Sequence, residues 1–227
     1  MARKKRIAVL GDTHFEYTHW QTIYHFYDFI EKEQPDYVVQ IGDLKDCFAQ
    51  KRFTSKIIDP QTEFENSHQC AVDFWYTIRQ LCKKAQLVQI LGNHDLRPIR
   101  QATDKCPELI PFLKWQDSFK FEGVKTIFDH RESFVIDGIN FTHGHRKHGT
   151  HMLENLMPTV VGHLHLGGVV YQNIGGKLIW ELNVGYAGDP ESEALGYTTK
   201  KYVNWSHGFG FIDEHGPRFI PYDGKKR

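Results

Sequence analysis

Two histidines stand one residue apart in the stretch VVGHLHLGG, where His163 and His165 follow a valine pair and a glycine. A strand that runs out into a loop can direct alternate side chains at one point, so a His-x-His pair at a strand end can supply two metal ligands. The same pair is equally compatible with two surface histidines. Further ligands elsewhere in the chain are needed to decide between a metal site and a surface pair.

Three short apolar runs, over residues 7–10, 37–41 and 87–91, each stop at a glycine followed by polar residues, in GDTH, GDLKD and GNHD. Each run is typical of a buried strand that leads into a loop. Such loops gather at the carboxyl edge of a parallel sheet, where α/β proteins bind their ligands. Together with the later THGH stretch, these loops hold oxygen and imidazole donors: Asp12, His14, Asp43, Asn93, His94, Asp95 and His143.

The donors include no thiolate, which suits divalent Mn, Fe, Zn or Ni better than a purely structural zinc site. Their number is sufficient for two ions. Two ions about 3.5–4 Å apart need a shared anionic ligand that holds the like charges together. Asp43 stands alone after its strand and is the natural bridging ligand.

The order of these blocks, D-x-H, G-D, G-N-H-D, H-G-H and G-H-x-H, resembles that of the calcineurin-like metallophosphoesterases, over Asp12 to His165. The resemblance implies two divalent ions, with manganese the first expectation. It implies that one ion is held by Asp12, His14, Asp43 and His165, and the other by Asp43, Asn93, His143 and His163. It also implies a catalytic role for His94 beside the metals, with Asp95 orienting the imidazole.

The chemistry of phosphoester hydrolysis agrees with this assignment. Two ions lower the pKa of bound water and neutralise the charge that develops on the phosphoryl oxygens. The leaving oxygen needs a proton, which an imidazolium held by a carboxylate can supply. Three further residues are candidates for substrate contact. Arg97 has a planar fork suited to phosphate, with a loop salt bridge as the alternative, and His145 and His148 follow the THGH stretch, with surface positions as the alternative.

Helical patterns lie between the first strands. Ile23, Phe26, Tyr27 and Ile30 follow a Thr18/Gln21 capping box, and Cys70, Ala71, Phe74, Ile78, Leu81 and Cys82 follow Thr62/Glu65. This alternation predicts a parallel sheet in the first half. In the second half we expect a helix around residues 148–156, a hairpin turn at Asp137-Gly138, and a second, more antiparallel sheet. Its strands are expected near residues 119–121, 126–128, 133–136, 139–142, 159–161, 168–172, 178–182 and 208–212.

The sequence therefore predicts an α/β fold with two stacked mixed β-sheets flanked by helices, in a single domain spanning residues 1–227. The 28 basic and 28 acidic residues give a formal charge of zero, which argues against broad electrostatic wrapping of nucleic acid. The four cysteines show no CxxC spacing and no secretory leader precedes them, so we expect a cytoplasmic protein. No apolar run approaches a membrane span, and no obligate protein partner is evident.

The motifs also narrow the class of substrate, because they differ from those of protein phosphatases. Protein Ser/Thr phosphatases of this superfamily carry G-D-x-H-G, G-D-x-V-D-R-G and G-N-H-E, whereas this chain has GDTHF, GDLKDCF and GNHD. The GNHD form is similar to that of DNA-repair exonucleases and stand-alone phosphodiesterases, and the segment YVNWSHGFGFID is similar to the ends of small phage phosphoesterases. The stretch 44–66 is long enough to overhang the site. Its Lys51, Arg52 and Lys56 are either contacts for a nucleotide or nucleic-acid backbone or exposed loop charges.

The expected function is metal-dependent hydrolysis of a phosphoester in a nucleotide or nucleic acid, with a phosphodiesterase or nuclease favoured. A nucleoside monophosphatase is the first alternative. A non-catalytic metal-binding scaffold is the second alternative. It is disfavoured because such family members usually lose metal ligands or the catalytic histidine, whereas this chain keeps them all.

Overall fold

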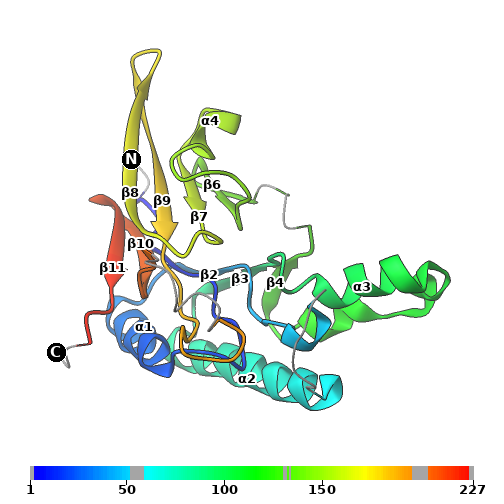
Figure 1. The fold of residues 1–227 in the computed structure, drawn as a ribbon. Helices are drawn as coiled ribbons and strands as arrows, with labels where there is room; N and C mark the ends of the chain where they lie inside the picture. Colours follow the sequence, from blue (N-terminus) through cyan, green and yellow to red (C-terminus); the bar gives the residue numbers. More distant parts are fainter. Residues whose placement is uncertain (1–2, 52–58, 130–131, 133, 196–203, 225–227) are drawn as a thin grey trace.

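The computed structural model describes residues 3–51, 59–129, 132, 134–195 and 204–224. Six strands form the first sheet, in the order β11-β10-β1-β2-β3-β4 (Figure 1). β1 to β4 are parallel, as predicted for the first half, whereas β10 is antiparallel to β1 and β11 to β10. Their bounds are β1 Ile7–Leu10, β2 Tyr37–Ile41, β3 Gln86–Ile90, β4 Val124–Ile127, β10 Gly208–Asp213 and β11 Gly216–Pro221.

Five strands form the second sheet, in the order β5-β6-β7-β9-β8. The sheet is mixed, because β6 and β9 both run parallel to β7 while the two outer pairs are antiparallel. The predicted hairpin turn joins β5 to β6, and Asp137 and Gly138 both have positive φ, as this tight turn requires. The bounds are β5 Phe134–Ile136, β6 Ile139–Thr142, β7 Thr159–Val161, β8 Gly167–Ile174 and β9 Lys177–Val184.

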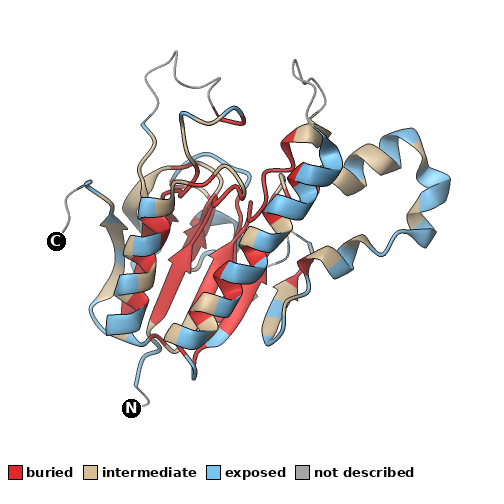
Figure 2. Cartoon of the chain, turned by 90° about the horizontal axis from the view of Figure 1, so that it is seen from below, coloured by how far each residue is buried: buried red, intermediate tan, exposed pale blue. Residues whose placement is uncertain are grey.

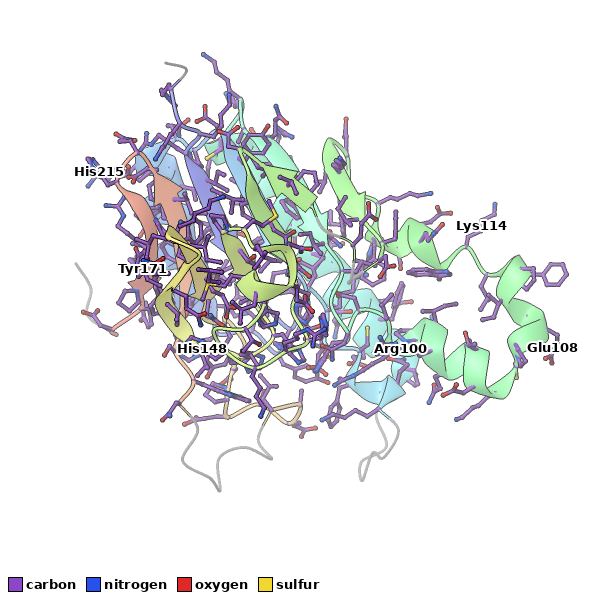
Figure 3. All side chains as sticks on the ribbon, turned by 90° about the horizontal axis from the view of Figure 1, so that it is seen from above. Arg100, Glu108, Lys114, His148, Tyr171 and His215 are labelled. Carbon is purple, nitrogen blue, oxygen red and sulfur yellow. The ribbon has the colours of Figure 1, made fainter. Side chains whose placement is uncertain are left out.

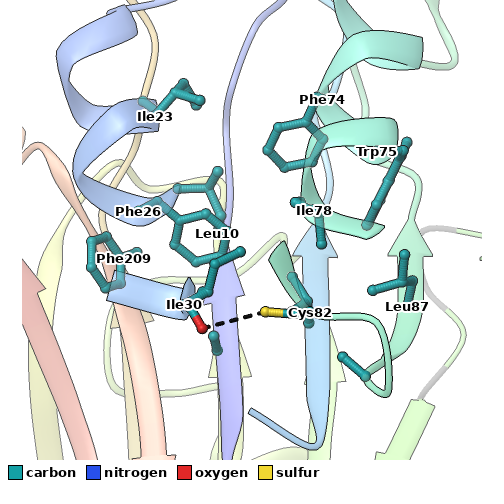
Figure 4. Packing of buried hydrophobic residues seen from close by; sticks show 14 of the residues in the cluster. Leu10, Ile23, Phe26, Ile30, Phe74, Trp75, Ile78, Cys82, Leu87 and Phe209 are labelled. Carbon is teal, nitrogen blue, oxygen red and sulfur yellow. Dashed lines mark hydrogen bonds between the residues drawn. The ribbon is translucent and has the colours of Figure 1, made fainter. Parts of the chain in front are cut away.

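The first sheet is buried on both faces, which explains why its strands are continuous apolar runs. In β1, Ala8 and Leu10 face α1 (Trp20–Glu33) and α2 (Pro60–Leu81), while Ile7 and Val9 pack against the second sheet. Figure 2 shows the two helices lying side by side over the buried strands. Figure 4 shows the helix side of this core, where the Cys82 thiol donates to the Ile30 carbonyl oxygen at 3.3 Å.

Both predicted helices are present, but neither begins at its predicted capping box. The N-cap of α1 is His19, and the hydroxyl of Thr18 donates to the Thr13 carbonyl instead. The N-cap of α2 is Asp59, whose carboxylate accepts from the backbone N–H groups of Gln61 and Thr62, with Pro60 at the first helical position. The Asp-Pro pair is the stronger start signal, because proline is suited to the first turn.

An arm, residues 97–119, projects from the body of the protein (Figures 1 and 3). It consists of α3 (Arg97–Lys105) and the 3₁₀ segments η2 (Pro107–Phe112) and η3 (Trp115–Phe119), none of which the sequence patterns predict. The strand expected near residues 119–121 is wrong. Phe119 ends η3, where its ring packs with Leu91 and Leu96 at the base of the arm.

Other elements of the second half differ from the prediction in assignment more than in position. The expected helix around residues 148–156 contains only α4 (Met152–Asn155). β4 and β10 pair within the first sheet, and β11 is an additional strand. Strand patterns define which face is buried, whereas sheet membership depends on pairings between distant segments. The described part of the chain contains no helix long and apolar enough to cross a membrane.

Candidate metal centre

The predicted donors converge at the carboxyl ends of five parallel strands. The loops after β1, β2, β3, β6 and β7 bring together side chains that are separated by up to 153 positions in the sequence, as Asp12 and His165 are. Within the described residues, three groups have ligand atoms that all lie within 4.8 Å of one another. These groups are Asp12, His14 and His165; Asp43, His143 and His163; and His14, Asp43 and His94.

The first group has two imidazole nitrogens facing each other. Nε2 of His14 lies 3.4 Å from Nε2 of His165, and the latter is 3.3 Å from the Oδ1 atom of Asp12. Because Nδ1 of His14 is hydrogen-bonded to Asp46 at 2.9 Å, its Nε2 is the nitrogen left to bind a cation. Two such nitrogens beside a buried carboxylate need a proton or a metal ion between them.

The second group is organised around His143. Its Nδ1–H donates to the carbonyl of Ile41 at 2.9 Å, which leaves Nε2 as the ligating nitrogen. That Nε2 atom lies 3.3 Å from Oδ2 of Asp43 and 3.1 Å from Oδ1 of Asn93. The ring of His163 stands edge-on to His143, with centroids 5.1 Å apart. The geometry therefore brings together the four residues expected around one ion.

Asp43 lies between the two groups, since its carboxylate belongs to one set with His143 and to another with His14. Burial opposes its ionisation, but the neighbouring imidazoles of His143 and His94 outweigh burial and hold the pKa of Asp43 well below its usual range. The same field acts on His143. Burial opposes its protonated form, yet Asp43 and Asp12 raise the pKa of His143 to about 10. A site with this negative potential and with facing nitrogens fits a divalent cation.

The backbone at the centre is shaped for close approach. Asp12, His14, Asp43, His163 and His165 all have φ between 50° and 64°, a conformation that non-glycine residues adopt rarely and mostly at functional sites. Two glycines make room for the side chains. A Cβ atom on Gly92 would lie 2.1 Å from Oδ1 of Asp43, and one on Gly42 would lie 2.2 Å from Nδ1 of His143.

His94 is held by two partners. Its Nδ1 lies 3.1 Å from Oδ2 of Asp46, and Nη2 of Arg97 donates to its Nε2 at 2.8 Å. A guanidinium has donors only, so Nε2 is the acceptor and Nδ1 carries the hydrogen that is donated to Asp46. Burial lowers the pKa of His94 despite the charges of Asp43 and Asp46. Arg97 also donates to Oδ1 and to the carbonyl oxygen of Asp46, both at 2.9 Å.

The expectation that Asp95 orients His94 is wrong in this structure. Both oxygens of Asp95 accept backbone N–H bonds, from Gly92 and Lys45 at 2.8 Å and from Leu44 at 3.2 Å. Burial and the charge of Asp43 raise the pKa of Asp95 to about 6. Its carboxylate thus joins the GDLKD and GNHD loops, and the orienting position belongs to Asp46.

Sequence reasoning missed Asp46, although a signal was present. GDLKD contains a second carboxylate three positions after Asp43. Asp46 is fully buried, and the hydrogen bonds and charges of His14 and His94 overcome burial to hold its pKa below the usual range. A buried carboxylate at such a position requires partners, and only the fold identifies them.

The remaining candidates lie around the centre. Arg97 is held by Asp46 and His94 rather than by a loop salt bridge alone. His145 has Glu154 as its ion-pair neighbour at 3.7 Å, and His148 is exposed (Figure 3). No described contact joins either histidine to the metal-binding groups.

In the stretch 44–66, residues 44–48 are buried and residues 60–66 belong to α2, whereas residues 52–58, the middle of the expected overhanging loop, lie outside the described residues. Within it, the ammonium of Lys51 donates to the Ala194 carbonyl at 3.0 Å. Arg52 and Lys56 lie outside the described residues.

Comparisons with known proteins agree with this geometry. The model of the calcineurin-like phosphoesterase family matches residues 5–209. The Gene 54 proteins of Mycobacterium phages L5 and D29 are 26% and 28% identical over 245 and 250 residues, each match covering 97% of this chain and 94% of the relative. The structure of Vacuolar Protein Sorting 29 from Cryptosporidium parvum shares the fold, with a TM-score of 0.53 and 15% identity over 100% of this chain and 96% of that one.

Proposed function

We propose that this chain, which belongs to the calcineurin-like phosphoesterase family, is a hydrolase that cleaves phosphodiesters in nucleotides or nucleic acid. Family membership and the His/Asp cluster make it a metallophosphoesterase. The diester substrate is inferred from the GNHD form of the third motif and from the departures from the protein phosphatase motifs. The observation that carries the proposal is the position of the Asp43 carboxylate, which belongs to one ligand group with His143 and His163 and to another with His14 and His94.

The residues that would hold two divalent ions are those that the resemblance to the family implies. Asp12, His14 and His165 would bind one ion, Asn93, His143 and His163 the other, and Asp43 would bridge them. When bound, the ions would activate water and neutralise charge on the phosphoryl group. We propose manganese as the first metal to test, since nitrogen and oxygen ligands accept several divalent metals and cellular availability selects among them.

The protein's own contribution to the reaction centres on His94. Asp46 holds Nδ1 of this imidazole, so its Nε2 can be directed at the leaving oxygen and deliver a proton there. In the structure that Nε2 atom accepts from Arg97, which must therefore release His94 before Nε2 can carry a proton. The released guanidinium would then lie beside the phosphoryl oxygens, because its planar pair of N–H donors matches their geometry.

The test is hydrolysis of bis(p-nitrophenyl) phosphate and of p-nitrophenyl phosphate by the purified protein, with manganese and with a chelator. We expect the diester to be cleaved, the activity to require metal, and Asp43→Asn to lose both activity and bound metal. We expect His94→Gln to retain the metal and to lower kcat by about 100-fold or more. The matched control is His215→Gln, which changes an exposed histidine outside the centre.

Three results would contradict the proposal. Cleavage of the monoester alone would indicate a nucleoside monophosphatase. Failure to cleave either ester with metal bound would indicate a non-catalytic scaffold. Full diesterase activity after chelation would show that the ligand groups are not the reactive centre.

A further inference from the structure

Aromatic rings extend from the candidate metal ligand His165 away from the centre. His165 stacks on Tyr186 with centroids 4.9 Å apart and planes within 7°. Tyr186 stacks on His207 at 4.4 Å, and His207 stacks on His19 at 4.2 Å. These four rings form one column. Of the four, only His165 belongs to a metal-ligand group.

Trp205 lies beside this column rather than in it. Its ring is nearly perpendicular to both His165 and Tyr186, at 72° and 64°, with centroids 4.3 Å and 5.2 Å away. A ring seated on the outer face of His165 would be remote from Tyr186. A ring that is close to both must instead turn one of its own faces towards the edges of His165 and Tyr186. One face of the indole therefore lies against these two rings, and Trp205 remains partly exposed.

Backbone hydrogen bonds hold the tryptophan in this position. The N–H of Ser206 donates to the His165 carbonyl at 2.9 Å, and the N–H of Tyr186 donates to the Ser206 carbonyl at 3.1 Å. An isolated bridge also pairs Tyr186 with His207. Ser206, which follows Trp205, is thus hydrogen-bonded through its backbone to both residues whose rings the indole contacts. Trp205 is therefore placed, through its neighbour Ser206, next to a candidate metal ligand.

We propose that the exposed part of the Trp205 indole stacks on a nucleobase of the substrate whose phosphoester is bound beside His165. This inference rests on the proposed function and makes its substrate class specific, since a base has the planar face that an indole binds well. Stacking of this kind tolerates different bases, so Trp205 would select nucleotides over simple phosphoesters without selecting one base.

The test compares two diesters that release the same p-nitrophenolate, thymidine 5′-(p-nitrophenyl phosphate) and methyl p-nitrophenyl phosphate. We expect Trp205→Leu to lower kcat/KM for the thymidine ester by about tenfold, mainly through KM, and to leave the methyl ester nearly unchanged. Trp205→Phe keeps an aromatic face and should retain most of the preference. Tyr24→Leu, which removes an exposed aromatic ring on α1, is the matched control.

A second measurement does not depend on Trp205→Leu being folded. Thymidine 5′-monophosphate should quench tryptophan fluorescence in the wild-type protein and quench it much less in Trp205→Phe. The proposal is overturned if the preference for the thymidine ester survives in Trp205→Leu, or if both esters lose activity equally, which would mean that the indole only supports His165. If the wild-type protein cleaves neither ester, the proposed function itself fails and this inference fails with it.

Discussion

His14 and His94 share one carboxylate oxygen. The Nδ1 atoms of the two imidazoles lie 2.9 Å and 3.1 Å from Oδ2 of Asp46, and their rings meet edge-on with centroids 4.7 Å apart. A candidate metal ligand and the proposed proton donor are therefore oriented by the same buried group. In the proposed mechanism, a change at this group affects metal binding and proton transfer together.

Asp46→Asn tests this coupling. An amide oxygen in the place of Oδ2 can accept from both imidazoles, but the amide NH2 group would then face the Arg97 guanidinium, and the charge that holds Arg97 and both histidines is lost. We expect both the affinity for manganese and kcat on the diester to fall by about 10- to 100-fold. Isothermal titration calorimetry and steady-state kinetics measure the two losses. A variant that loses activity but binds metal like the wild type would show that His14 does not depend on Asp46.

Asp95→Asn should act mainly on stability. The carboxylate accepts three backbone N–H bonds, and an amide oxygen cannot satisfy all three in the same arrangement. We expect the free energy of unfolding to fall by about 1–3 kcal/mol, as measured by urea denaturation. The pH profile of the remaining activity should keep its shape, because no described hydrogen bond joins Asp95 to His94. A shift of the acidic or basic limb of that profile would instead show that Asp95 orients His94.

Gly92→Ala tests the tight contact between the GNHD loop and Asp43. The added methyl group would lie 2.1 Å from Oδ1 of Asp43, so either the loop or the carboxylate must move. We expect loss of manganese binding and of most activity. Gly175→Ala, at the β8–β9 turn, is the control. Its Cβ meets nothing within 4 Å, so although the φ of 58° strains an alanine there, the variant should bind metal normally. Normal metal binding by Gly92→Ala would show that Asp43 is not the bridging carboxylate.

Glu181 predicts a specific pH dependence of stability. It is buried in β9 and accepts from the backbone N–H groups of Gly149 and His151 and from the His151 imidazole. Burial opposes its ionisation, but the hydrogen bonds from the His151 imidazole, the Asn183 amide and the Gly149 N–H lower the pKa of Glu181 from 4.5 to about 2. The stabilisation, about 3 kcal/mol, is complete above the unfolded-state pKa and is lost as the pH falls from 4.5 towards 2.

Glu181→Gln should therefore be less stable than the wild type at pH 7, with a difference that shrinks as the pH falls below 4.5. Urea denaturation at a series of pH values measures this difference. Asp117→Asn, at an exposed ion pair with Lys120, is the control and should show little effect. A difference between Glu181→Gln and wild type that does not change with pH would mean that the carboxylate has an ordinary pKa in the folded protein.

The sequence by itself determined the α/β class, the three buried strands that precede the motifs, and the set of donors that meet at their ends. These features are local: an apolar run of four or five residues predicts a strand, and the residue after its glycine lies at the edge of the sheet. Asp12 and Asp43 were identifiable in this way because each follows its strand directly.

The tertiary structure decided which side chains act together. Asp95 adjoins His94 in the chain, yet the turn of the loop directs its carboxylate to three backbone amides. Asp46, 48 positions away, reaches the imidazole instead. Trp205 likewise meets His165 only through the pairing of backbone segments that are distant in sequence. Hydrogen-bond partners depend on direction and on distances of about 3 Å, and sequence spacing does not specify either across separate strands.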